Sequence, residues 1–483
     1  MTAGSQSRFV IGVVVWGATG LAGVAATTPA CATPLPDAAL GYDFVYVAPY
    51  GDHDRFAVEG LDEMGRVVGA SFGTYITPAI WFNGRSDVFD AGPLYSHRGI
   101  PLGISPTTGV VVGYFFDGRD NEPLVWTLGR RYFLTLPPGI REARASDAND
   151  SGWVVGDSSF PREGILWRPG HEPLVIGSLP LQQNTVPGGI NAIGEVAGGY
   201  YRNDYGHRAF YWREDLGMFD ISDPGSLYNG SGGSDINDLG EVVGASSDIN
   251  GQQGAFLWRD GEFRYYPLLY GCDTARQWAV AINNLGHAVG TSYGCGNGGA
   301  VVWWETETPG VFDVADLNDR AVVPSLPADF YLHSGTDVNN GGQILAGAEM
   351  ESPPYHYGGA LLTPYHFELS DLTPGRAGEL NSLTVSRLEP GAQAYFIWGR
   401  NPGARTFNSV LGTGAGHPPI DCPGAPILIQ QPRGLFGPFT ADLNGEITLE
   451  FMIPAPASGQ TVRMQVAVPE ECRVSHVVEV TIE

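Results

Sequence analysis

The feature that most constrains the fold of this chain is a short pattern that recurs seven times. The best copies have an Ile/Val-Asn-x-x-Gly turn, a Val-rich strand ending in Gly, a variable loop, and then a small residue, two apolar residues and Trp. Weaker copies depart from it, as at Leu61-Asp62 and at Ile104-Ser105, where the Asn is missing. The strand-ending glycines are Gly69, Gly113, Gly156, Gly198, Gly244, Gly290 and Gly347. A spacing of about 45 residues is the period of a four-stranded propeller blade. The sequence therefore predicts an all-β fold, a seven-bladed β-propeller followed by a small β-sandwich domain.

The ends of such an array must be protected, because an unpaired strand edge invites aggregation. Residues 43–47 read as a strand that precedes the first turn, and the last copy stops soon after Leu362. Pairing of these two segments would complete the last blade and close a ring. The alternative is a linear solenoid, in which the first and last copies lie far apart.

Two residues of the turn have a clear local purpose. Asn, as in Asn237, caps the turn with its side chain, and Gly three positions later, as in Gly240, takes the positive φ that a tight hairpin needs. The recurring Trp is large and apolar, and we expect it to pack between neighbouring blades.

The repeat resembles the bacterial extracellular repeats named for a His-Ala-Phe tripeptide, the HAF family. The shared core is Ile-Asn-x-x-Gly-x-Val-Val-Gly, and the tripeptide itself is degenerate here, as in His207-Arg-Ala209-Phe210 and Gly254-Ala255-Phe256. The resemblance covers roughly residues 42–366. It implies a secreted, propeller-like fold and no particular activity.

The two ends of the chain indicate export and a second domain. Residues 1–32 read as a signal peptide, because Arg8 precedes an apolar stretch and Ala30-Cys31-Ala32 is a small-x-small cleavage site. We expect cleavage near Ala32 and a secreted, extracellular or periplasmic product. Residues 33–366 would then form the propeller and residues 367–483 the sandwich. No later segment is apolar and long enough to span a bilayer.

Charge and cysteine content narrow the class of protein further. The net charge is −26 and Lys is absent, so the chain has no cationic face for nucleic acid or for an anionic membrane. Beyond Cys31, four cysteines remain, an even number suited to an oxidising compartment. Proximity in sequence predicts disulfides that join Cys272 to Cys295 and Cys422 to Cys472.

No catalytic or metal-binding constellation stands out. Gly-x-Ser-x-Gly occurs at residues 69–73 and 290–294, but at the ends of the Val-rich repeat strands and not at a strand-to-helix elbow. The chain lacks a His-Glu-x-x-His helix and a P-loop. The segments Asp235-x-Asn237-Asp238 and Asp147-x-Asn149 place oxygen atoms on turns but do not match an EF-hand loop. We therefore expect no cofactor, with Ca²⁺ kept only as an alternative.

Aromatic and polar residues are instead concentrated in the variable loops between the second and third strands of each repeat. In a propeller of four-stranded antiparallel blades, these loops all lie on one face of the ring. Aromatic rings beside Asp, Arg and Asn on a rigid scaffold suit recognition of a glycan or a protein; the simpler interpretation is ordinary exposed loops. The candidate binding residues are Tyr114, Phe116, Asp117, Arg119, Asp120, Tyr200, Tyr201, Arg202, Asp204, Tyr205, His207, Tyr355, His356 and Tyr357.

Three functions remain open at this point. The first is a non-catalytic binding or surface-interaction protein. The second is an extracellular hydrolase or lyase that acts on polysaccharide, with Asp117, Asp120, Asp204 and His207 as candidate acids and bases; it requires two carboxylates about 5–9 Å apart in a pocket. The third is a structural envelope protein, which predicts no concave aromatic pocket.

Overall fold

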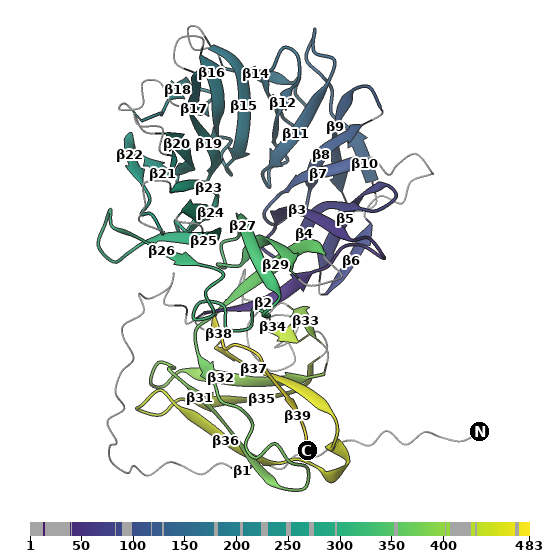
Figure 1. The fold of residues 1–483 in the computed structure, drawn as a ribbon, viewed down its shortest axis with the longest axis vertical. Coiled ribbons are helices and arrows are strands. Elements are labelled where there is room, and N and C mark those ends of the chain that lie inside the picture. The colour runs from purple at the N-terminus through teal and green to yellow at the C-terminus, as the bar shows by residue number, and fades with distance from the viewer. Residues whose placement is uncertain are drawn as a thin grey trace, which may run out of the picture. The chain divides into compact units, whose positions relative to one another are not determined.

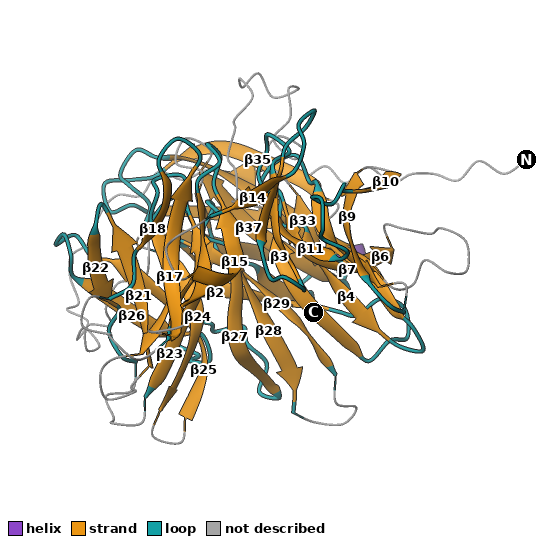
Figure 2. Cartoon of the chain, turned by 90° about the horizontal axis from the view of Figure 1, so that it is seen from above, coloured by secondary structure: helices purple, strands orange, loops and turns teal. Residues whose placement is uncertain are grey.

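The computed structural model describes residues 13–14, 39, 41–82, 84–88, 99–116, 118–127, 130–177, 182–202, 206–223, 230–247, 253–269, 275–294, 297–351, 356–400, 402–405, 427–429, 432–468 and 473–483. Its contacts divide the chain into two compact units, one of residues 42–363 and one of residues 364–483 together with β1 (Val13–Val14). Figure 2 shows that both units are built from strands and loops. Among the helices of the described residues, none has the length and apolar character that crossing a membrane requires.

The first unit consists of the seven repeats, each with four strands. The first strands are β3 (Arg55–Leu61), β7 (Gly99–Ile104), β11 (Ala143–Ala148), β15 (Gln182–Ile190), β19 (Ser231–Ile236), β23 (Arg276–Ile282) and β27 (Phe330–Val338). The second strands are β4 (Val67–Phe72), β8 (Val111–Phe116), β12 (Val154–Ser158), β16 (Val196–Arg202), β20 (Val242–Ser247), β24 (Ala288–Gly294) and β28 (Ile344–Met350). The third strands are β5 (Ile76–Phe82), β9 (Asn121–Thr127), β13 (Gly164–Trp167), β17 (Gly206–Arg213), β21 (Gln253–Arg259), β25 (Asn297–Glu305) and β29 (Tyr357–Tyr365). The fourth strands of repeats 1–6 are β6 (Arg85–Val88), β10 (Arg130–Phe133), β14 (Leu174–Ile176), β18 (Gly217–Asp220), β22 (Glu262–Tyr265) and β26 (Phe312–Asp316).

The sheets follow one another in a propeller-like circle (Figure 1). Repeats 2–6 each form their own four-stranded antiparallel sheet, with the strands in chain order. Each first strand contacts the first strand of the next repeat, and β27 contacts β3. The predicted partner of the last repeat is present: β2 (Gly41–Val47) pairs with β29 beside β27 and β28. The N-terminal strand of the unit thus supplies the fourth strand of the seventh repeat.

In repeats 1–6 a glycine in the second strand lies opposite a bulge in the first strand, and the close approach of the two backbones there favours glycine. Every first strand shifts register at the same point, as between Gly233 and Asp235 in β19. A Cβ on Gly244 would lie 2.0 Å from the Gly232 carbonyl oxygen, far inside any real contact. In repeat 7 the register places Ala346 at this position, because Ala346 pairs with Gly335. Our assignment of Gly347 to it was therefore one residue off.

The turn between the first two strands behaves as predicted and also joins the repeats. Gly240 has φ +77°, and Asn237 Oδ1 accepts the backbone N–H groups of Leu239 and Glu241. The Asn237 side-chain amide also donates to the Asn283 carbonyl of the next repeat at 2.9 Å. The corresponding side-chain amides of Asn149, Asn191, Asn283 and Asn339 each donate to the next repeat's turn in the same way.

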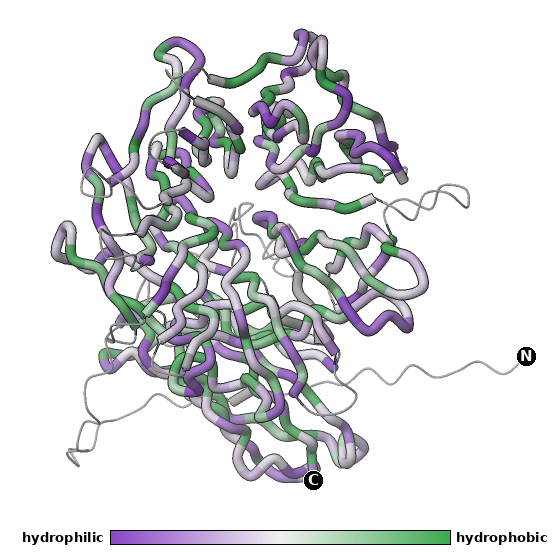
Figure 3. Tube along the Cα trace, turned by 45° about the horizontal axis from the view of Figure 1, so that its top comes forward, coloured by the Kyte–Doolittle hydropathy of each residue, from purple (hydrophilic) through white to green (hydrophobic). Residues whose placement is uncertain are grey.

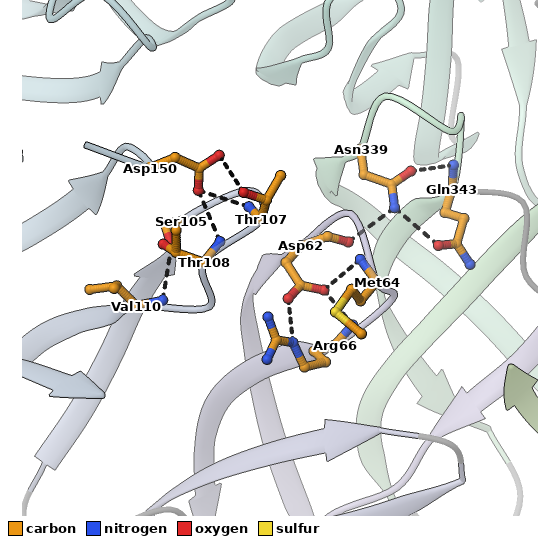
Figure 4. Close-up of polar contacts among 10 residues, drawn as sticks. All are labelled: Asp62, Met64, Arg66, Ser105, Thr107, Thr108, Val110, Asp150, Asn339 and Gln343. Carbon is orange, nitrogen blue, oxygen red and sulfur yellow. Dashed lines mark hydrogen bonds and ion pairs between the residues drawn. The ribbon is translucent and has the colours of Figure 1, made fainter. Parts of the chain in front are cut away.

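This chain of hydrogen bonds continues across the junction between the last repeat and the first. Figure 4 shows Asn339 donating its side-chain amide to the Asp62 carbonyl, over 3.0 Å. The same view shows Asp150 accepting the Thr107 and Thr108 N–H groups, which joins repeats 2 and 3. The Asn of the Asn-x-x-Gly turn therefore has two roles: it caps its own turn, and its side-chain amide bonds that turn to the turn of the next repeat.

Apolar side chains form a series of small cores between neighbouring sheets. Figure 3 shows hydrophobic segments in sheet after sheet of the first unit. One core combines Val47, Phe56 and Trp81 with Leu345 and Leu361, and so spans the first and last repeats. The recurring tryptophans Trp81, Trp126, Trp167, Trp212 and Trp303 are all buried, as predicted. Trp258 is half-buried.

The second unit contains two main sheets and a hydrophobic core of its own. One sheet has the order β1, β36 (Ile447–Met452), β31 (Leu380–Ser386), β30 (Glu368–Leu369). The other has the order β35 (Pro432–Thr440), β32 (Gln393–Gly399), β37 (Thr461–Val468), β38 (Arg473–Val474), with β39 (Val478–Thr481) also paired to β37. The strands β33 (Pro402–Arg405) and β34 (Ile427–Ile429) pair with each other, and η2 (Ala455–Ala457) is a single 3-10 turn. β1 lies within the predicted signal peptide, so cleavage near Ala32 would remove it.

Candidate functional site

A polar groove centred on repeat 4 is lined by Tyr201 and His207, two of the predicted binding residues. We call the side of the first unit that carries the loops between second and third strands the loop face. The groove opens there, encloses about 390 Å³, and combines side chains from repeats 3, 4 and 5. Its lining consists of Arg162, Asn184, Val186, Pro187, Gly188, Gly199, Tyr201, His207, Ser231, Gly232 and Gly233. We refer to it as the repeat-4 groove.

The groove exists because one first strand lacks a side chain where the others have one. In repeat order, the equivalent first-strand residues are Ala57, Ile100, Arg144, Val186, Gly232, Trp278 and Ser334. A Cβ on Gly232 would meet no atom within 4 Å. A Cβ on Gly199, which also lines the groove, would meet its nearest atoms only at 3.7 Å. The two glycines therefore leave open space above the backbone.

An aromatic pair and a cation border this space. Tyr201 in β16 and His207 in β17 are directly opposed in register, and their ring centroids lie 5.4 Å apart in an edge-to-face arrangement. The Arg162 Nε donates to Asp157 Oδ2 over 3.1 Å, and Asp157 is also 3.6 Å from the Arg144 guanidinium. Two arginines therefore share one buried carboxylate, which leaves positive charge beside the groove.

Only some of the predicted binding residues line the repeat-4 groove. Tyr201 and His207 line it. Tyr114 is half-buried, with the Arg144 guanidinium 5.9 Å from its ring centroid. Phe116, Arg119, Asp120 and Tyr357 are exposed, Arg202 and His356 are half-buried, and none of these six lines the groove. Asp117, Asp204, Tyr205 and Tyr355 lie outside the described residues.

Tyr200 differs from its predicted role as an exposed loop residue. Its side chain is 1% exposed, and its hydroxyl donates to Asp220 Oδ2 at 3.0 Å. Burial and the Asp220 carboxylate raise the pKa of Tyr200. Adjacent residues of a strand point to opposite faces, so Tyr200 packs into the core while Tyr201 reaches the groove. A ligand cannot stack on Tyr200.

Sequence analysis missed Arg162, Asn184 and Gly232. The signal for Gly232 was present: the segment Gly230-Ser-Gly232-Gly233 begins a first strand where most other repeats place bulkier residues. Alignment of the repeats on their first strands, rather than on the Asn turns, would have revealed it.

A second cavity of about 390 Å³ lies on repeat 1 and was not predicted. Tyr50, His53 and Tyr75 contribute its rings, and Asp52 contributes a carboxylate. His53 Nδ1 is hydrogen-bonded to the Ser71 hydroxyl at 2.9 Å. Ser71 is fully buried, so its hydroxyl holds the connection before β3 in place rather than facing a ligand.

Three carboxylates on first strands join alternate pairs of repeats. Asp147, Asp235 and Asp337 each accept a backbone N–H from the next repeat, over 2.9, 2.9 and 2.7 Å. The other oxygen of each accepts the N–H of the following residue. Desolvation raises the pKa of Asp147 to about 6 and that of Asp337 to about 7. The oxygens that we considered for Ca²⁺ at Asp147 and Asp235 thus accept protein N–H groups, and no cluster of three candidate metal ligands occurs among the described residues.

The half-buried Glu59 makes stability depend on pH. Burial raises the pKa of Glu59 to about 7, so folding favours its neutral form. The stabilisation that the neutral Glu59 side chain provides is fully present below the pKa of Glu in the unfolded chain, about 4.3. It is lost as pH rises through 7. We expect calorimetry to show that Glu59→Gln reduces the fall in stability between pH 5 and pH 8 by about 2 kcal/mol relative to the unsubstituted chain. An unchanged pH dependence in the variant would contradict this assignment.

The four cysteines of the predicted disulfides, Cys272, Cys295, Cys422 and Cys472, lie outside the described residues. Both predicted bonds therefore remain predictions.

Comparisons with known proteins find likeness in structure alone. No family model and no curated protein matches the chain. Virginiamycin B lyase from Staphylococcus aureus aligns with 67% of this chain and 98% of its own, at 12% identity and a TM-score of 0.42. A gluconolactonase from Xanthomonas campestris aligns with 54% and 95%, at 14% identity and a TM-score of 0.30. Prolyl oligopeptidase B from Galerina marginata aligns with 73% and 57%, at 11% identity and a TM-score of 0.36.

Proposed function

We propose that this chain is a secreted, non-catalytic binding protein that holds an extracellular glycan in the repeat-4 groove. In this proposal the seven repeats are the blades of a closed seven-bladed propeller, and the C-terminal unit is a β-sandwich. The pairing of β2 with β29 and the contact of β27 with β3 support the closed ring.

The observation that carries the proposal is the open backbone of Gly232 beside the Tyr201–His207 pair. A sugar ring needs an apolar face to stack on and polar groups that fix its orientation. Tyr201 offers the first, while His207, Arg162 and Asn184 offer the second. Because Gly232 and Gly199 leave the floor uncovered, a ligand can approach the backbone there.

The two other functions fit the groove less well. A structural envelope protein requires no concave aromatic site, yet the repeat-4 groove is one. A polysaccharide hydrolase of the retaining or inverting type uses two facing carboxylates. The described lining of this groove has none, and that of the repeat 1 cavity has Asp52 alone.

A glycan array followed by titration calorimetry tests the proposal. We expect Tyr201→Ala to weaken binding of the best array ligand about tenfold to a hundredfold, since buried tyrosines at binding sites contribute about 1–3 kcal/mol. Gly232→Leu fills the groove without meeting protein atoms near its Cβ and is expected to abolish binding.

The matched control is Tyr132→Ala, which removes a tyrosine that is 50% exposed on β10, outside the groove. It should bind like the unsubstituted chain. An array without any ligand, or a ligand that the Tyr201→Ala and Gly232→Leu variants bind normally, would refute the proposal.

A further inference from the structure

The C-terminal unit contains an apolar cavity between its two main sheets. Protein interiors are close-packed, so a void of about 110 Å³ is unusual and calls for an explanation. Leu383 and Leu449 line it from one sheet, and Phe396 and Met464 line it from the other. Such a cavity has too few polar groups to hold water well.

A polar pair stands at the edge of this cavity. Arg400 follows β32, Gln460 precedes β37, and the Arg400 guanidinium donates to the Gln460 side-chain carbonyl. Arg400 is exposed, and within the described part of the chain it has no carboxylate partner. Its positive charge is therefore available to an anion.

The volume limits what can enter. A dry cavity of about 150 Å³ lined by Leu, Ile and Phe accepts benzene, so one of this smaller size accepts a short alkyl chain. We propose that the C-terminal unit binds a small anionic amphiphile: a short-chain carboxylate whose alkyl chain fills the cavity and whose carboxylate pairs with Arg400. This site is independent of the repeat-4 groove.

Three probes of equal chain length separate the two parts of the proposal. Hexanoate, hexanol and hexylamine are titrated into the whole protein and followed by calorimetry or ligand-observed NMR. We expect hexanoate to bind at least tenfold more tightly than hexanol, and hexylamine to bind most weakly. Arg400→Gln, at an exposed site where folding is not at risk, is expected to remove the advantage of hexanoate. Equal binding of hexanoate and hexanol would overturn the role of Arg400.

Two alanines of the same 3-10 turn supply a matched pair of variants for the cavity itself. Ala457 lines the cavity, whereas Ala455 is exposed and does not. Ala457→Leu is expected to block all three probes, and Ala455→Leu to leave them unchanged. Failure of hexanoate to bind the unsubstituted chain, or unaltered binding by a folded Ala457→Leu variant, would overturn the proposal.

Discussion

Gly244→Ala is expected to destabilise the repeat unit by about 3 kcal/mol, the upper end of the usual cost of an overpacked site. The added Cβ would lie 2.0 Å from the Gly232 carbonyl oxygen and 3.0 Å from the Gly233 Cα. Neither atom can retreat easily, because Gly233 pairs with Gly244 and the next first strand packs against β19 and β20. Differential scanning calorimetry measures the effect.

The control for this variant lies on the adjacent strand. Gly232→Ala adds the same methyl group to a glycine whose φ is not in the left-handed region, at a point where a Cβ meets nothing within 4 Å. Its stability is expected to stay within about 0.5 kcal/mol of the unsubstituted chain. Equal stability of the two variants would show that the bulge does not impose the glycine.

Removal of β2 is expected to have the largest effect of any change to the chain. A chain that begins after Val47 lacks the fourth strand of the seventh repeat and leaves the edge of β29 paired only with β3, at Tyr357 and Arg55. It also loses Tyr42 and Val47, which are 2% and 0% exposed, and burial of such side chains stabilises by about 1.5–3 kcal/mol each. We expect aggregation, or a folded fraction too small to purify.

The matched control begins at Ala39 and keeps β2 entire. It is expected to have the same oligomeric state as the full chain by size-exclusion chromatography with light scattering, and its first unit is expected to unfold at the same temperature. If the shorter chain also kept that oligomeric state and that unfolding temperature, β2 would not be the strand that completes the last repeat.

Features that a single repeat determines could be predicted from the sequence. The positive φ of Gly240, the Asn237 cap and the burial of Trp303 all depend on neighbours within a few residues or on size and polarity. The partner strand of the last repeat was also predictable, because edge protection leaves few alternatives.

The individual hydrogen bonds between repeats were not predictable. The Asn237 amide bond to Asn283, and the joints made by Asp147 and Asp235, require knowing which turns and strands become neighbours. The groove is a related case. Its floor is defined by the absence of a side chain at Gly232, and a search for aromatic and charged residues does not detect an absence.

The central claim, that the first and last repeats are neighbours in a ring, is tested most directly by distances between equivalent turns. Met64 in repeat 1, Ile193 in repeat 4 and Gly341 in repeat 7 occupy the same turn position, and Met64 and Ile193 are 42% and 69% exposed. Genetically encoded spin labels at these positions, read in pairs by electron–electron resonance, give the order of the distances. The account predicts that residues 64 and 341 are closer together than residues 64 and 193. A 64–341 distance that is the longest of the three would contradict it and indicate an open ladder.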